Sequence, residues 1–105
     1  MIKDGLYSVH FSSPLGAGSG VVVISGNTFR GGDAGIAYVG SLWEQDGEIN
    51  ASLRTFRHAQ VQDQISVLGS DETQIELQGR QENAEQFTLA APSSGLEAVL
   101  SWLQK

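Results

Sequence analysis

The dipeptide Asp46-Gly47 constrains this chain more than any other feature, because it separates two runs of alternating apolar and polar residues. Asp-Gly is a preferred pair for a two-residue type I′ turn, which joins antiparallel strands in a defined register. The flanking runs 36–45 and 48–57 are therefore predicted to pair, with Trp43 opposite Asn50. The inner face predicted by that register carries Tyr38, Gly40, Leu42, Ile49, Ala51 and Leu53.

Alternation of period two continues along most of the chain and predicts six further strands. Their expected ranges are 4–12, 19–25, 28–30, 64–69, 73–81 and 85–91. Thirteen glycines against two prolines fit short strands joined by tight turns. The motif Gly31-Gly32-Asp33 interrupts the ladder. It is expected to form a bulge or a sharp bend, because glycine adopts positive φ without penalty.

A different pattern follows Pro92. Apolar residues recur there at the helical spacing i, i+3, i+4, i+7, namely Leu96, Val99, Leu100 and Leu103. Ser94 with Glu97 three residues later has the form of a capping box. The pattern predicts one amphipathic helix over 94–104, packed on the sheet.

Together these elements predict an all-β fold, an eight-stranded antiparallel up-and-down barrel with one C-terminal helix. The barrel strands are expected over about 4–91 within a single domain, 1–105, a length that supports one hydrophobic core. A β-sandwich of the same strands is the structural alternative. A barrel of eight strands has an interior that side chains fill or that holds one small ligand.

Composition argues against several classes of function. The chain has no cysteine, which excludes disulfides and thiolate metal sites and favours a reducing, cytoplasmic compartment. No apolar run is long enough for a signal peptide or a membrane span. Twelve acidic residues against six Lys and Arg give a net charge of −6, whereas direct binding of nucleic acid needs a concentrated positive surface.

Catalytic motifs are not found either. The two histidines, His10 and His58, have no second ligand at metal spacing, and no serine sits in a nucleophile elbow. The glycine-rich stretch 16–20 lacks the lysine of a phosphate loop and is expected to be a hairpin loop. The sequence therefore predicts a protein that is not an enzyme, with no catalytic residue, metal or cofactor.

The candidate binding surface is the tip of the predicted hairpin. Three acids, Glu44, Asp46 and Glu48, lie close together there. Their plain interpretation is a solubilising turn, and their functional interpretation is a surface that recognises a basic partner. Trp43 is expected on the outer face beside them, where an exposed tryptophan often anchors an interface. The competing expectation is that the C-terminal helix covers Trp43.

An ordered series of short motifs resembles the GrlR-like negative regulators of type III secretion. The motifs are Asp4-Gly5-Leu6-Tyr7-Ser8, Phe11-x-Ser13, Gly18-x-Gly20-Val21, Gly31-Gly32-Asp33 and Tyr38-x-Gly40-x-Leu42, within residues 3–57. The resemblance implies a lipocalin-like barrel in a dimeric cytoplasmic protein, which binds a transcriptional activator and keeps it from DNA. An acidic run supports that contact in the family's namesake. Here the corresponding stretch is Glu44-Gln45-Asp46-Gly47-Glu48, with neutral residues between the acids.

The sequence thus predicts a regulatory protein that sequesters a transcriptional activator, a basic DNA-binding protein. The contact residues are expected to be Trp43, Glu44, Asp46 and Glu48. The alternative is a lipocalin-like carrier or sensor of a small apolar ligand. In that case the cavity is expected to be lined by Tyr7, Phe11, Tyr38, Leu42 and Phe87.

Overall fold

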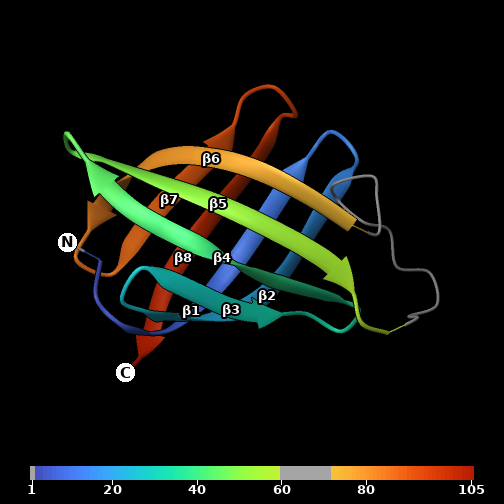
Figure 1. The fold of residues 1–105 in the computed structure, drawn as a ribbon, viewed down its shortest axis with the longest axis horizontal. Coiled ribbons are helices and arrows are strands. Elements are labelled where there is room, and N and C mark those ends of the chain that lie inside the picture. Colours follow the sequence, from blue (N-terminus) through green and yellow to red (C-terminus); the bar gives the residue numbers. More distant parts are fainter. Residues whose placement is uncertain (1, 60–71) are drawn as a thin grey trace.

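Eight antiparallel strands form a closed barrel in the described part of the chain, residues 2–59 and 72–105 of a computed structural model (Figure 1). The strands are β1 (Gly5–Ser13), β2 (Gly16–Ser25), β3 (Thr28–Gly32), β4 (Ile36–Gln45), β5 (Glu48–Arg57), β6 (Glu72–Asn83), β7 (Gln86–Ala91) and β8 (Leu96–Gln104). Each strand pairs with the next, and β8 pairs with β1. The predicted barrel is therefore confirmed.

The predicted C-terminal helix over 94–104 is wrong, because this segment is the closing strand β8. It pairs with β7 on one edge and with β1 on the other. Residues Leu96, Ala98 and Leu100 are buried, which is the two-residue period of a strand. Leu103, which a helix would bury, is 50% exposed. Pairing with β1 satisfies the backbone of both strands and outweighs the helical spacing of the leucines.

The predicted strand over 64–69 lies outside the described residues. The strand that follows β5 in the described chain is β6, which begins at Glu72 and continues to Asn83. The turn before β7 is therefore formed by residues 84–85, slightly later than the sequence pattern suggests. The described residues still form eight strands, because β8 occupies the segment where the helix was expected.

The register predicted for the central hairpin is confirmed. Trp43 lies opposite Asn50, and Gln45 opposite Glu48. The predicted inner face is also confirmed, since Tyr38, Leu42, Ile49, Ala51 and Leu53 are all buried. Side chains from the other strands complete the core, among them Tyr7, Val9, Phe11, Phe29, Phe87 and Leu89.

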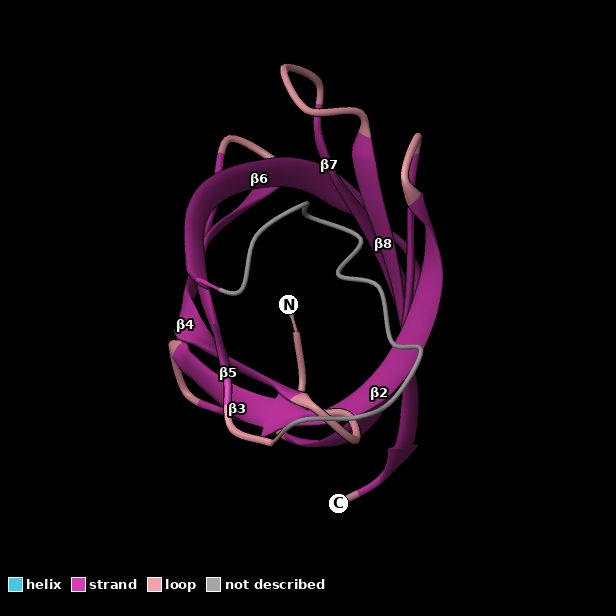
Figure 2. Ribbon diagram, turned by 90° about the vertical axis from the view of Figure 1, so that its right-hand side faces the viewer, coloured by secondary structure: helices cyan, strands magenta, loops and turns pink. Residues whose placement is uncertain are grey.

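The two ends of the barrel carry different segments, and the ring of strands between them is seen in Figure 2. One end, called here the hairpin end, has the β2–β3, β4–β5 and β6–β7 turns and the entry to β1. The other end, called the Leu15 end, has the β1–β2, β3–β4 and β7–β8 turns. In the described chain, no helix has the length and apolar character needed to cross a membrane.

Candidate functional site

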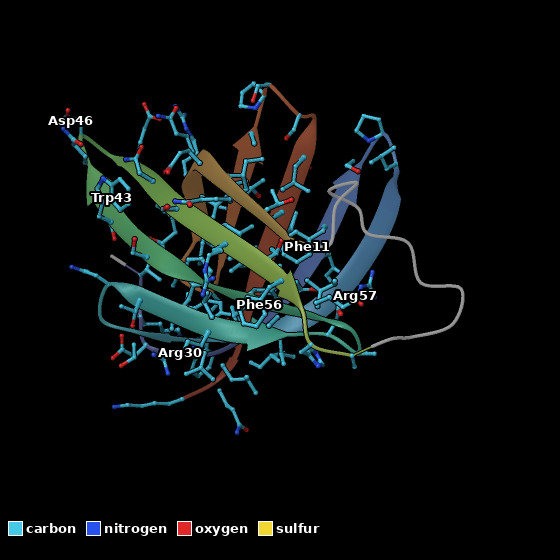
Figure 3. All side chains as sticks on the ribbon, turned by 45° about the vertical axis from the view of Figure 1, so that its right-hand side comes forward. Phe11, Arg30, Trp43, Asp46, Phe56 and Arg57 are labelled. Carbon is cyan, nitrogen blue, oxygen red and sulfur yellow. The ribbon has the colours of Figure 1, made fainter. Side chains whose placement is uncertain are left out.

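The tip of the β4–β5 hairpin is a type I′ turn. Asp46 has φ 55° and Gly47 has φ 82°, as both central residues of that turn require. Among residues with a Cβ, aspartate and asparagine are the best suited to positive φ. The turn therefore accounts for the choice of Asp46, and its carboxylate points into solvent at the end of the molecule (Figure 3).

Trp43 stands beside this tip on the outer surface of the barrel (Figure 3). Its side chain is 40% exposed, and the segment 94–104, which was expected to cover it as a helix, is the strand β8. Its neighbour Leu42 and the opposing strand's Ile49 are buried in the core. Because these two apolar side chains anchor the hairpin, Trp43 and the acids at the tip are held on a regular strand pair rather than on a loose loop.

The structure separates Glu44 from the other proposed contact residues. Side chains alternate along a strand, so Glu44 lies on the inner face at the barrel mouth, whereas Trp43 and Glu48 lie on the outer face. The backbone N–H of Ile2 donates a hydrogen bond of 2.9 Å to Glu44 Oε1. Glu44 therefore fastens the N-terminal segment to the hairpin, a role that the sequence pattern did not indicate.

A hollow of about 400 Å³ opens between the N-terminal segment and the hairpin. Its walls include Ile2, Asp4, Trp43 and Glu44. The Asp4 carboxylate forms part of this wall and accepts a hydrogen bond of 2.9 Å from the Gly26 N–H. The exposed indole of Trp43 thus stands between an acidic concave surface and the acidic tip.

The second tryptophan, Trp102 on β8, is part of a different contact. The Lys3 ammonium lies 3.7 Å from the centroid of its ring, and Lys3 also pairs with Glu85 at 3.6 Å. The indole N–H of Trp102 donates a 3.3 Å hydrogen bond to the Asp4 carbonyl oxygen. Trp102 therefore packs the chain entry against β8, and its ring is covered by a cation.

The Gly31-Gly32-Asp33 motif lies at the end of β3 and in the turn to β4. Asp33 Oδ1 accepts hydrogen bonds from the N–H groups of Gly35 at 2.9 Å and Ile36 at 2.8 Å. Its Oδ2 accepts a hydrogen bond from the Tyr38 hydroxyl. A Cβ at Gly31 would overlap the Val21 carbonyl oxygen on the neighbouring strand. The motif thus permits close packing of strands and closes a turn.

Two further bonds connect this turn to the end of β5. The His58 N–H donates to the Gly35 carbonyl oxygen at 2.9 Å, and His58 Nε2 donates to the Asp33 carbonyl oxygen at 2.9 Å. Burial, reinforced by the neighbouring Asp33 carboxylate, raises the pKa of Tyr38. A phenol held in its protonated form is a hydrogen-bond donor and a poor base. The cluster of Asp33, Tyr38 and His58 therefore holds the turn in place by hydrogen bonds.

Between the core side chains of the described residues lies one apolar space with a volume of about 30 Å³, against about 150 Å³ for a cavity that binds benzene. Four of the five side chains predicted to line a ligand cavity border this space, namely Phe11, Tyr38, Leu42 and Phe87. The fifth, Tyr7, packs edge-on against Phe87 at 5.7 Å and donates a hydrogen bond of 2.6 Å to the Lys3 carbonyl oxygen.

Phe29 fills the room that the small inner residues suggested. It lies directly opposite Gly40, and a Cβ at Gly40 would approach its ring to 2.6 Å. The sequence analysis did not assign Phe29 to the interior. The sequence feature that would have placed Phe29 inside is the pairing of a large aromatic residue with a glycine on the neighbouring strand. Such pairs are common in bent sheets, where the ring covers the glycine.

The described residues contain no group of three or more His, Asp or Glu side chains placed to hold a metal ion. His10 is exposed on the outer face of β1, and His58 makes the turn contacts given above. No protein-family model matches the chain, and a search of curated proteins also finds no match.

Proposed function

We propose that this barrel is a non-enzymatic regulatory protein that binds a basic, DNA-binding transcriptional activator in the cytoplasm and thereby keeps it from DNA. The observation that carries the proposal is the juxtaposition at the hairpin end. An exposed tryptophan, Trp43, stands beside two exposed acids, Asp46 and Glu48, on a strand pair anchored in the core. Aromatic anchors with a charged rim are typical of protein–protein contacts.

Charge supports the choice of partner. The chain carries a net charge of −6, which disfavours direct contact with phosphate groups and favours association with a basic protein. A DNA-binding surface is itself basic, so a protein that covers it competes with DNA for the same charges. The resemblance of residues 3–57 to GrlR-like regulators points to the same class of partner.

The interior offers less support for the alternative of a small-ligand carrier. Ligand sites usually enclose about 300–1,000 Å³ and include a few polar groups that fix orientation. The apolar space that Phe11, Tyr38, Leu42 and Phe87 border is only about 30 Å³. Binding at the outer surface therefore agrees better with the geometry than binding within the barrel.

The experiment uses a variant that lacks the charges of Asp46 and Glu48 but keeps the type I′ turn. Asp46→Asn with Glu48→Gln removes two charges, and asparagine is favoured in the type I′ turn. The wild-type chain and this variant are immobilised and exposed to native lysate, and the retained proteins are identified by mass spectrometry. We expect the wild type to retain a DNA-binding regulator that the variant loses. Displacement of that regulator from its DNA by the free wild-type chain completes the test.

A matched control removes two charges at the Leu15 end. Glu76→Gln with Glu97→Gln changes the net charge equally but leaves the hairpin intact, and it is expected to retain the regulator. Trp43→Ser should weaken the complex by about 2 kcal/mol or more, roughly 30-fold. Equal retention by the tip variant and the wild type, or a regulator that stays bound to DNA, would refute the proposed function.

A further inference from the structure

One half of β6 has an edge that no other described strand pairs with. β5 pairs with β6 from Glu72 to Gly79, whereas β7 pairs only with the part from Gln78 to Asn83. The reason is that β7 has only six residues and ends at Ala91, where a turn begins. The N–H groups of Ser94 and Gly95 both donate to the Ala91 carbonyl oxygen in that turn. Beyond it, residues 73–77 have no strand partner on their second edge among the residues that the structure describes.

This edge lies beside a hollow at the Leu15 end of the barrel. The hollow has a volume of about 150 Å³. Thr73 and Ile75 of β6 form one wall, and the other walls come from Leu15 in the β1–β2 turn, Ser94 in the β7–β8 turn and Leu96 at the start of β8. Figure 1 shows these two turns at the same end as the start of β6. Leu15 is 57% exposed, an unusual position for a leucine at the tip of a hairpin.

The surroundings of the hollow favour basic groups. None of the described side chains that line it is charged. The exposed charged side chains next to them along the chain are both acidic, Glu76 on β6 and Glu97 on β8. Residues 73–77 contain no lysine and no proline, the residues with which exposed strand edges are usually protected against pairing.

We propose that the open edge of β6 binds an extended peptide by strand addition, with one apolar side chain in the Leu15 hollow and basic residues on either side. Strand addition combines main-chain hydrogen bonds, which provide affinity, with pockets for alternate side chains, which provide specificity. A volume of about 150 Å³ holds a benzene-sized group and so admits one leucine, isoleucine or phenylalanine side chain. Glu76 and Glu97 complement the flanking cations.

The site is at the opposite end of the barrel from Trp43 and Asp46, so this proposal is independent of the regulatory one. The probe is a fluorescein-labelled peptide with a core of seven residues, in which threonine alternates with valine or leucine. Two lysines stand at each end of this core. Its binding to the full chain is followed by fluorescence polarisation. We expect saturable binding that weakens with salt, together with amide chemical-shift changes at residues 73–77.

Three comparisons test each part of the site. Peptide methylated on every backbone nitrogen of its seven-residue core should lose binding at least tenfold, because neither of its edges then has an N–H group to donate to a ladder. Leu15→Asp should weaken binding at least tenfold, and its exposure predicts an unchanged fold by circular dichroism. Glu76→Gln with Glu97→Gln should reduce the salt dependence, whereas Asp46→Asn with Glu48→Gln should bind as the wild type does.

The proposal is overturned if the peptide does not bind at millimolar concentration. It is also overturned if the N-methylated peptide binds equally well, since contact would then not involve strand pairing. Equal binding by Leu15→Asp would show that the hollow is not occupied. Chemical-shift changes confined to the hairpin end would place the peptide at the other surface.

Discussion

The hydroxyl of Tyr38 donates a hydrogen bond to the carboxylate of Asp33, which links a core side chain to the turn between β3 and β4. The ring of Tyr38 is buried and packs edge-on against Phe11 at 5.0 Å. The same carboxylate accepts two backbone N–H groups of its own turn. The Asp33 side chain therefore connects a surface turn to a residue that is packed in the core.

Replacing this hydroxyl tests how much the link stabilises the fold. Tyr38→Phe keeps the ring but leaves Asp33 Oδ2 without the phenol donor, and we expect the free energy of unfolding to fall by about 1–3 kcal/mol. Urea denaturation measures the change. Asp33→Ala should cost at least as much because it also removes the two N–H bonds. The double variant should be less than additive, and strict additivity would show that the two residues are not coupled.

Stability should decline above pH 10 through the two buried tyrosines. Burial raises the pKa of Tyr38, with a further contribution from Asp33. Burial and Asp4 raise the pKa of Tyr7, partly opposed by its hydrogen bond to Lys3. The unfolded chain releases these protons near pH 10 while the folded chain keeps them, so the free energy of unfolding falls as the pH rises.

The limiting slope is about 1.4 kcal/mol per pH unit for each tyrosine. Urea denaturation at pH 8, 10 and 11 measures it, and Tyr38→Phe should flatten the dependence. Below pH 9 neither tyrosine should contribute to the pH dependence. An identical decline in the wild type and in the double Phe variant of Tyr7 and Tyr38 would contradict this account.

Gly40 should tolerate no side chain. A Cβ there would overlap the Ser52 carbonyl oxygen and approach Phe29 Cζ to 2.6 Å. Gly40→Ala is therefore expected to lower the free energy of unfolding by about 1–3 kcal/mol, the usual range for overpacking. Thermal unfolding measures the loss. The neighbouring Ser41→Ala, on the outer side of β4, serves as the control and should change stability by less than about 0.5 kcal/mol.

The closing strand provides a test that separates strand from helix. A strand places Ala98 in the core at 2% exposure and leaves Leu103 half exposed, whereas a helix with the leucine spacing would bury Leu103. Ala98→Asp should prevent folding, because it buries an unpaired carboxylate. Leu103→Asp should cost less than about 0.5 kcal/mol. Far-UV circular dichroism and urea denaturation of both variants check this, and the reverse order of effects would contradict β8.

The sequence was most informative where the type of turn determined how the two flanking strands pair. Asp46-Gly47 allowed one register for β4 and β5, and that register determined which residues are buried. Glu44 could not be assigned in this way. Its partner is the backbone of Ile2, more than forty positions away, and no local pattern encodes such a bond.

The error at the C-terminus has a physical cause. Leu96 and Leu100 satisfy both a period of two and the helical spacing, so they do not distinguish the two structures. The deciding residue is Ala98, which is small enough to be read as neutral in either pattern. The requirement that β1 have a partner on its second edge would have favoured a strand, because β1 otherwise remains unpaired on that side.

The pairing of β8 with β1 also has a consequence for synthesis of the chain on the ribosome. β1 is made well before its second partner β8, across a separation of 93 positions for Ser8 and Ser101. Until β8 is made, β1 therefore exposes one row of unpaired backbone groups. Closure of the ring depends on this long-range contact, so a nascent chain of this kind is expected to need protection from association until β8 emerges.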